Sequence, residues 1–341
     1  MSGRLPRRQA LGALAALAAL LLLPHVADTF WVLQIAAQAL ILGTLALSLT
    51  FLAAYLGVVS LAQVTVAGFA AYAIAYFGPN TAGLGVPLPW PATVALALAA
   101  ATLGGGLIGL IAHRSTGIYA IMITLAISVA FFYLTRQNYS LFNGWNGFAG
   151  LRPPAPFGLS LAAPLPFYHL CLALAVVLLC GVLLFVRSPL GLAIQGVRDG
   201  ARRMRALGFR TLPLIVAAYS VAGLIAGCAG ILGAWYHGRV SSFSVGLGPT
   251  IDILIIAVIG GLVHPAGAYL GALVFVLVDT FAIDLVDRDR FNTVIGLVFL
   301  LIVLASPDGL IGLLRAGLAR FGLRRGAEFR APGPPVDIER T

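Results

Sequence analysis

The sequence contains no lysine and little charge of any kind. Of its 341 residues, 60% are hydrophobic and 9% are charged, and every one of the 21 basic residues is an arginine. A phosphate-binding P-loop requires a lysine, so this chain has no such loop and any ATP used must be hydrolysed by another polypeptide. Catalysis through a lysine Schiff base is excluded for the same reason.

Cysteine is also scarce. Cys171, Cys180 and Cys228 lie in apolar runs without the spacing of metal ligands, which indicates small packing residues. The five histidines are scattered near the ends of apolar runs and form no cluster. We therefore expect no metal and no cofactor in this chain. A membrane-embedded enzyme would need clustered polar side chains at one membrane depth, and the sequence offers no such cluster.

The scarcity of charge excludes a soluble domain of this length, which needs far more charge to cover its surface. In lipid, a long apolar run must satisfy its own backbone groups, as helices and closed barrels do. The runs here are continuous and do not alternate, which predicts helices. We therefore expect an all-α, polytopic membrane helix bundle.

Ten apolar runs are candidate spans, some of them broken. The first resembles a signal peptide, but the residues after Pro24 make a poor cleavage site, so we expect a retained span. The run 251–263 is short for a crossing, which takes about 20 residues. The candidate spans are residues 10–23, 31–55, 58–77, 91–112, 117–134, 167–186, 212–235, 251–263, 266–283 and 292–305.

The arginines are distributed unevenly between the two sides of this bundle. If the N-terminus is cytoplasmic, all but five fall in the N-terminal tail, the turn 113–116, the loop 187–211 and the C-terminal tail. This bias predicts a bacterial inner-membrane protein with both termini in the cytoplasm. It also accounts for the basic excess, so we expect no nucleic-acid partner. The segment 315–341 is basic without apolar periodicity, which predicts a disordered cytoplasmic tail. The five exceptions are Arg136, Arg152, Arg239, Arg288 and Arg290.

The loop 187–211 is the one cytoplasmic loop between spans that is long enough to hold structure. Ser188-Pro189 is a helix start signal, and Gly208 is suited to a helix C-terminus. Apolar residues recur at helical spacing against a charged face, namely Leu190, Ile194, Val197 and Ala201 against Arg198, Arg202 and Arg205. The pattern fits either a helix anchored on the lipid surface or a helix that docks into a partner protein.

Polar residues recur along the second span. Gln34, Gln38, Thr44, Ser48 and Tyr55 fall within about 120° of arc at 100° per residue. Such a stripe faces the bundle interior or water, and either a solute path or interhelical hydrogen bonding would explain it.

Two short polar interruptions break the apolar pattern. The first holds Gly57, Ser60 and Gln63, and the second begins at Gly260 and Gly261. A broken helix can present backbone groups to a polar solute, although a tight turn between two spans is the alternative.

Acidic residues are rare in the spans. Asp252 opens the run at 251, where the helix dipole would stabilise a carboxylate, and we interpret it in that way. Asp279 and Asp284 lie toward a span end. An ion-coupled secondary transporter would need ionisable residues in mid-span, so this alternative is weaker.

Six segments, in this order, resemble LivM-type permeases of branched-chain amino-acid ABC importers. The resemblance extends from about residue 40 to residue 314. Ala201, Arg203 and Arg205 depart from the acidic or small residues usual in that family, and Gln63 stands near its Gly-His. The segments are LGVVSLAQVTVAGFAAY (56–72), GIYAIMITLA (117–126), NGWNG (143–147), GLAIQGVRDGARRMRALGF (191–209), IDILIIAVIGGLVHPAGAYLGA (251–272) and SPDGLIGLL (306–314).

The resemblance implies an ABC importer permease fold over residues 1–314 and no enzymatic activity in this chain. It implies uptake of branched-chain amino acids or related small polar solutes by ATP-driven alternating access. A permease for a sugar, urea or a short amide is the alternative. The implied partners are a second permease subunit, two ATP-binding subunits, an external solute-binding protein and membrane lipid.

The resemblance also assigns candidate residues. The inner loop becomes a helix that couples the permease to its ATPase, with Gly191, Arg198, Asp199, Arg202, Arg205 and Gly208. The polar stripe and the two interruptions, by contrast, supply the residues that we expect along the substrate path: Gln34, Gln38, Ser48, Gly57, Ser60, Gln63, Gly260 and Gly261.

Overall fold

The computed structural model describes residues 18, 20–24, 27–115, 117–155, 160–285, 296, 300 and 309–312. Nearly every element among these residues is helical. The elements are η1 (Trp31–Ala37), α2 (Gln38–Phe51), η2 (Leu52–Leu56), α3 (Gln63–Phe77), α4 (Trp90–Ala112), α5 (Ile118–Gln137), α6 (Tyr139–Phe142), β1 (Phe148–Ala149), α7 (Pro164–Arg187), α8 (Pro189–Ala206), α9 (Thr211–His237), β2 (Arg239–Val240), η4 (Ser242–Val245), α10 (Leu247–Gly260) and α11 (Gly267–Leu285).

Five helical segments of the described chain are long and apolar enough to cross a membrane: Trp31–Leu56, Trp90–Ala112, Ile118–Gln137, Pro164–Arg187 and Thr211–His237. Three shorter apolar helices are Gln63–Phe77, Leu247–Gly260 and Gly267–Phe281. These helices confirm an all-α, multi-pass membrane protein. The count of ten spans stays a prediction, because most of 10–23 and 292–305 lies outside the described residues.

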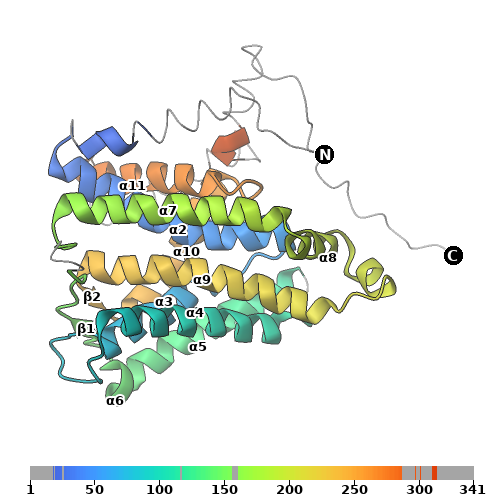
Figure 1. The fold of residues 1–341 in the computed structure, drawn as a ribbon, viewed down its shortest axis with the longest axis horizontal. Helices are drawn as coiled ribbons and strands as arrows, with labels where there is room; N and C mark the ends of the chain where they lie inside the picture. The colour runs from blue at the N-terminus through green and yellow to red at the C-terminus, as the bar shows by residue number, and fades with distance from the viewer. Residues whose placement is uncertain are drawn as a thin grey trace, which may run out of the picture.

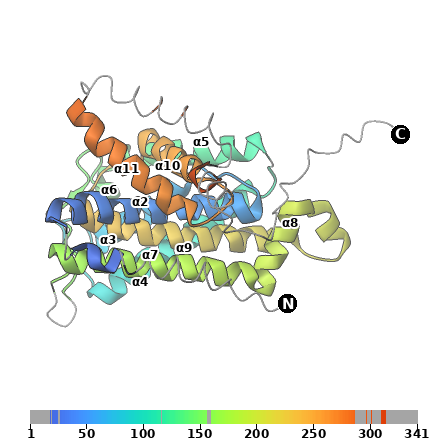
Figure 2. The ribbon, with the colours of Figure 1, turned by 90° about the horizontal axis from the view of Figure 1, so that it is seen from above.

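The long helices run side by side, with α8 at one end of the bundle and α6, β1 and β2 at the other (Figure 1). Seen from above, α8 extends beyond the ends of the long helices (Figure 2). Since the arginine distribution predicts a cytoplasmic α8 loop, the end that carries β1 and β2 is the predicted outer end.

The helix α2 is apolar all round and is buried along almost its whole length. An all-round apolar helix belongs in the centre of a bundle. The helix α9 packs against α2 and also against α4, and α4 and α9 approach each other closely through glycine. A Cβ atom on Gly105 would lie 2.5 Å from the carbonyl oxygen of Tyr219 and 3.0 Å from the Cα of Gly223. Small residues therefore allow the backbones of two membrane helices to touch.

The second span is α-helical only in its middle. It begins with the π-helical segment η1 and ends with a second π-helical segment, η2. A π-helix closes its hydrogen bonds between residues five apart and therefore has more residues per turn than an α-helix. The assumption of 100° per residue thus fails at both ends of this span. Gln34 and Tyr55, which lie in these two segments, therefore do not keep the rotation that the predicted polar stripe assumed.

Candidate functional site

The chain between η2 and α3 leaves helical geometry at residues 57–62. Gly57 ends η2 in the left-handed conformation, with φ +76°, and α3 begins at Gln63. Two hydroxyl groups of α5 satisfy the backbone in this gap. Leu61 donates its N–H to Thr124 Oγ1 at 3.1 Å and accepts from Ser128 Oγ at 3.0 Å. The break is therefore held in place by α5, with the polar backbone groups of Leu61 paired as lipid requires.

A cavity of about 360 Å³ opens at the predicted outer end of the bundle. It lies among α2, α3, α9, β2, η4, α10 and α11. Aliphatic and aromatic side chains form much of its wall, including Ile41, Leu42, Leu45, Ile253 and Phe275. The cavity is also bordered by small residues, so backbone lies close to its surface. These small residues are Ala67, Gly68, Ala71, Ala229, Gly230, Gly233 and Ala234.

Charged residues of both signs line the same cavity. Asp252 on α10 and Asp279 on α11 are half-buried, whereas His237 and Arg239 are exposed at its border. Gln38 is the one residue of the predicted substrate path that borders it. Among the described residues, the carboxylates of Asp252 and Asp279 have no hydrogen bond and no ion pair within 4.0 Å. The ion pair present in that part of the chain joins Arg198 to Asp199.

The loop before β1 positions Arg239. The strand β1 pairs antiparallel with β2, and Ala149 lies opposite Arg239 in the register. A Cβ atom on Gly147 would lie 2.1 Å from the carbonyl oxygen of Val240, and the φ of Gly147 is +65°, so this close approach requires glycine. Asn143 donates its side-chain amide to the Gly147 carbonyl at 2.6 Å, which closes the turn.

The same loop is held against the outer end by an aromatic contact. The ring of Trp145 lies edge-to-face on Phe243 of η4, with the ring centres 4.8 Å apart. The guanidinium carbon of Arg136 lies 4.5 Å from the centre of the Trp145 ring, a cation–π geometry. Arg136 and Arg239 are two of the five arginines that break the predicted cytoplasmic bias, and each has a local contact or pairing that accounts for its position.

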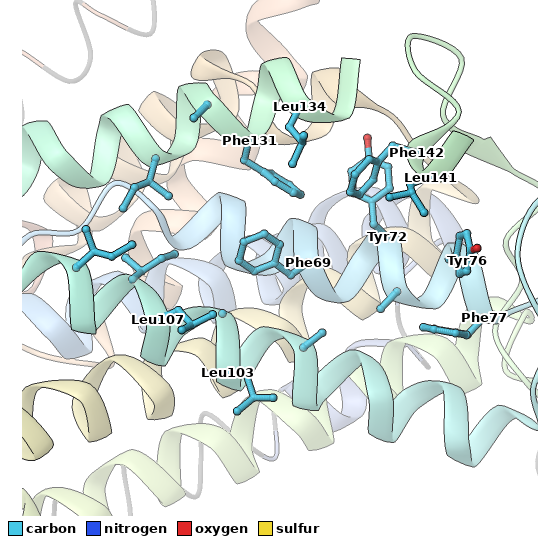
Figure 3. Close-up of a pocket in the computed structure, with 17 residues that line it drawn as sticks. Phe69, Tyr72, Tyr76, Phe77, Leu103, Leu107, Phe131, Leu134, Leu141 and Phe142 are labelled. Atoms are coloured by element: carbon cyan, nitrogen blue, oxygen red, sulfur yellow. The ribbon is translucent and has the colours of Figure 1, made fainter. Parts of the chain in front are cut away.

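A larger cavity of about 850 Å³ lies between α3, α4, α5 and α6 (Figure 3). Figure 3 shows Phe69, Phe131 and Phe142 among the rings that line it. Its lining is apolar apart from the hydroxyl-bearing rings of Tyr72 and Tyr76. Such a lining gives a small polar solute few groups to orient it, so the charged cavity is the better candidate for transport.

The helix α8 has the predicted caps. Ser188 accepts a hydrogen bond from the Gly191 N–H at 3.2 Å with its hydroxyl oxygen. At the other end Gly208 has φ +87°, and the N–H groups of Gly208 and Phe209 bond back to the carbonyls of Arg205 and Met204, each at 3.0 Å. This pattern is a Schellman motif, which ends a helix.

The two halves of α8 face different surroundings. The helix leaves helical geometry at Gly200 (φ 170°, ψ 86°), a kink that the sequence pattern did not predict. Before the kink, Ile194 and Val197 are buried in the main apolar core of the bundle. After it, Arg202 and Arg205 are exposed. The apolar face of α8 is thus anchored on the bundle itself, while the two arginines after the kink remain exposed.

Arg198 connects α8 to the end of the second span. Its guanidinium donates to the backbone carbonyl of Ala54 and to the Asp199 carboxylate, the latter at 3.0 Å. Its side-chain stem lies against Gly57, where an added Cβ atom would be 2.7 Å from Arg198 Cγ. Arg198 therefore joins the kinked helix to the break that Gly57 begins.

The family model for "Branched-chain amino acid transport system / permease component" matches residues 31–304. The chain belongs to this family. It is 26% identical over 241 residues to the high-affinity branched-chain amino acid transport system permease protein LivM of Escherichia coli, covering 64% of this chain and 56% of that protein. The LivM protein of Salmonella typhimurium is 24% identical over 237 residues, covering 63% and 55%. The chain thus spans about half the length of the curated relatives it matches. No solved structure matches it.

Most of the predicted path residues of this family member lie away from the charged cavity. Gln34 is exposed outside it, and Ser48 is buried with its hydroxyl donating to the Leu45 carbonyl at 2.6 Å. Ser60 accepts a hydrogen bond from the Ala62 N–H at 3.4 Å. Gln63 is 2% exposed at the start of α3. The π-helical segment η1 shifts Gln34, whereas Gln38 and Ser48 both belong to α2 and lie about 80° apart around its axis at 100° per residue.

The predicted interruption at Gly260 and Gly261 is a close crossing of backbones. A Cβ atom on Gly260 would lie 2.1 Å from the carbonyl oxygen of Gly267, and Gly261 has φ +103°. The turn between α10 and α11 closes with a bond from the Gly267 N–H to the His264 carbonyl at 2.9 Å. The alternative of a tight turn between two helices describes this geometry.

Several residues of the site were not found from the sequence. The interpretation of Asp252 as a first-turn carboxylate is wrong, because α10 begins at Leu247 and Asp252 lies beyond the first turn. Its convergence with Asp279 depends on the packing of α10 against α11. Thr124 and Ser128 had a usable signal, because two hydroxyl residues four apart on an apolar helix face the same neighbour.

Proposed function

We propose that the chain is a permease subunit of an ABC importer in a bacterial inner membrane, with both termini in the cytoplasm. It translocates branched-chain amino acids or related small polar solutes by ATP-driven alternating access. Family membership over residues 31–304 carries this proposal. The cavity supports it, because charged groups of both signs suit an amino acid better than a neutral sugar, urea or amide.

The working assembly contains this chain, a second permease subunit, two ATP-binding subunits and an external solute-binding protein. ATP binds to the partner subunits, since this chain has no lysine for a P-loop. The helix α8 receives the movement of the ATPase. Arg202 and Arg205 are exposed beyond the kink, so they are available for complementary charge on that partner.

Within the chain, the movement of α8 has a direct route to the cavity. Arg198 holds the end of η2 through the Ala54 carbonyl, and the break after Gly57 leads into α3. Val64 and Gly68 of α3 border the charged cavity. A shift of α8 is therefore transmitted across the break to the wall of the solute site.

The test is ATP-dependent uptake of labelled L-leucine, L-isoleucine and L-valine into proteoliposomes that hold the complete assembly. We expect accumulation that requires ATP on the ATPase side and the solute-binding protein on the other side. Uptake that persists without ATP but follows a sodium or proton gradient would refute the ABC mechanism. Transport of labelled sugar or urea in place of these amino acids would refute the solute class.

The role of α8 has its own test. Replacing Arg202 and Arg205 together by Glu is expected to reduce co-purification of the ATPase subunits and to abolish uptake, because two attractive charges become repulsive. Arg114→Glu removes a positive charge from another predicted cytoplasmic turn and serves as the control. If the double variant retains its ATPases and its uptake as the control does, α8 is not the coupling helix and its arginines set orientation only.

A further inference from the structure

The acidic side of the charged cavity is formed by two neighbouring helices. Asp252 comes from α10 and Asp279 from α11, and both border the cavity. Charged side chains inside a membrane-embedded bundle are costly and mark solute or ion pathways. In the described part of the chain no basic side chain pairs with either carboxylate. Their combined field favours a cationic group in the cavity.

The basic side comes from the connection between α9 and η4. Arg239 is fixed in place by the β1–β2 pairing, and His237 precedes it at the end of α9. An arginine guanidinium presents several N–H donors that match a carboxylate in two parallel hydrogen bonds. Arg239 makes no ion pair with a described residue. Its side chain is therefore available for an external carboxylate at the border of the cavity.

The remaining wall suits an aliphatic side chain. Ile41, Leu42 and Leu45 of α2 and Phe275 of α11 are apolar and carry no hydrogen-bonding side-chain group. The volume of about 360 Å³ lies at the small end of the range for ligand pockets. A small molecule with one positive, one negative and one apolar part would meet a matching surface with each.

We infer that this cavity is a binding site for a zwitterionic aliphatic α-amino acid. Asp252 and Asp279 receive its ammonium group, Arg239 receives its carboxylate, and the α2 wall receives its side chain. This inference rests on the proposed function and adds to it the residues that read each part of the solute. It also gives Gln38, at the same cavity, a neutral polar contact with the solute.

The experiment measures binding to the complete permease–ATPase assembly in lipid nanodiscs without the solute-binding protein. This arrangement keeps the selectivity of that protein out of the measurement. Labelled L-leucine is displaced by unlabelled L-leucine, by 4-methylpentanoate, which lacks the ammonium group, and by 3-methylbutylamine, which lacks the carboxylate. We expect L-leucine to displace the label at least about tenfold better than either analogue, because each analogue loses charged hydrogen bonds.

The variants should separate the two charges. Asp252→Asn and Asp279→Asn should each weaken the binding of L-leucine and of 3-methylbutylamine by about tenfold or more, and should leave the binding of 4-methylpentanoate unchanged. Arg239→Gln should weaken the binding of L-leucine and of 4-methylpentanoate, and should leave the binding of 3-methylbutylamine unchanged. Asp28→Asn and Arg136→Gln, which change charged residues that do not border the cavity, are the matched controls. Ligand-free thermal stability shows that each variant is folded.

Each result has a defined consequence. If the aspartate and arginine variants bind all three compounds more weakly and to the same extent, these charges do not recognise the separate parts of the solute and the inference fails. Leucine transport by the wild type would still leave the proposed function intact. A wild-type assembly that transports and binds no branched-chain amino acid refutes both. If sodium ions stabilise the wild type and Asp252→Asn abolishes this effect without altering L-leucine binding, the acidic pair is a cation site.

Discussion

Replacing Thr124 by Val tests whether α5 holds the break that follows the second span. Valine has nearly the same shape as threonine but lacks the hydroxyl oxygen that accepts from the Leu61 N–H at 3.1 Å. Thr124 is fully buried, so no water replaces the lost acceptor. An orphaned buried donor costs about 1–3 kcal/mol, and hydrogen bonds between membrane helices average about 0.6 kcal/mol with a maximum near 1.7. We therefore expect a loss of about 1–2 kcal/mol.

Ser128→Ala removes the donor to the carbonyl of the same residue, Leu61. Its effect should be smaller, because an under-satisfied carbonyl is tolerated better than an orphaned N–H. The double variant should lose less stability than the two single variants lose together. Both hydrogen bonds hold the same segment at Leu61, so the first substitution releases this segment and already weakens the remaining bond.

Thr102→Val is the matched control. Thr102 donates only to the Leu98 carbonyl of its own helix, α4, at 2.7 Å, so its hydroxyl holds no other segment. We expect a change below about 0.5 kcal/mol. The assay is reversible unfolding in mixed micelles, with hydrogen exchange of residues 57–62 as the local readout. Equal stability losses for Thr124→Val and Thr102→Val, with unchanged exchange at Leu61, would refute the reasoning.

Two further predictions concern orientation and the solute path. In a background without the native cysteines, Arg203→Cys should react with a membrane-impermeant thiol reagent only from the cytoplasmic side, and Asn146→Cys only from outside. Reaction of both cysteines from one side would contradict the arginine-based topology. Gln38→Leu should reduce L-leucine uptake without reducing the amount of protein in the membrane, because it replaces a polar group at the charged cavity. Gln34→Leu, away from the cavity, should leave uptake unchanged. Equal effects on uptake would assign both glutamines to packing.

Local signals predicted the helices well. The helix after Ser188 begins at Pro189 and ends before Gly208, because the serine cap and the glycine terminus act within a few residues of chain. The predicted span 91–112 agrees with the observed helix α4, Trp90–Ala112, for a similar reason. Its apolar run is continuous and clearly bounded. Features set by nearby sequence are accessible from one chain alone.

The cavity could not be predicted in the same way. Asp252 and Asp279 are far apart in sequence and border one cavity only because α10 packs against α11. The π-helical turns at Trp31–Ala37 shift Gln34 away from Gln38, and no residue pattern in that segment distinguishes a π-helix from an α-helix. The pairing of Ala149 with Arg239 joins two short strands from distant loops, too short to show a period of two.

The contact between α8 and the second span has a consequence for how such a chain can change over time. Arg198 binds the main-chain oxygen of Ala54, and every amino acid at position 54 supplies that oxygen. The acceptor therefore survives any substitution there that leaves the backbone in place. Side chains that border the charged cavity can therefore vary while the contact between α8 and the second span stays intact. On the α8 side, position 198 is restricted to a side chain long enough and with enough N–H donors to reach it.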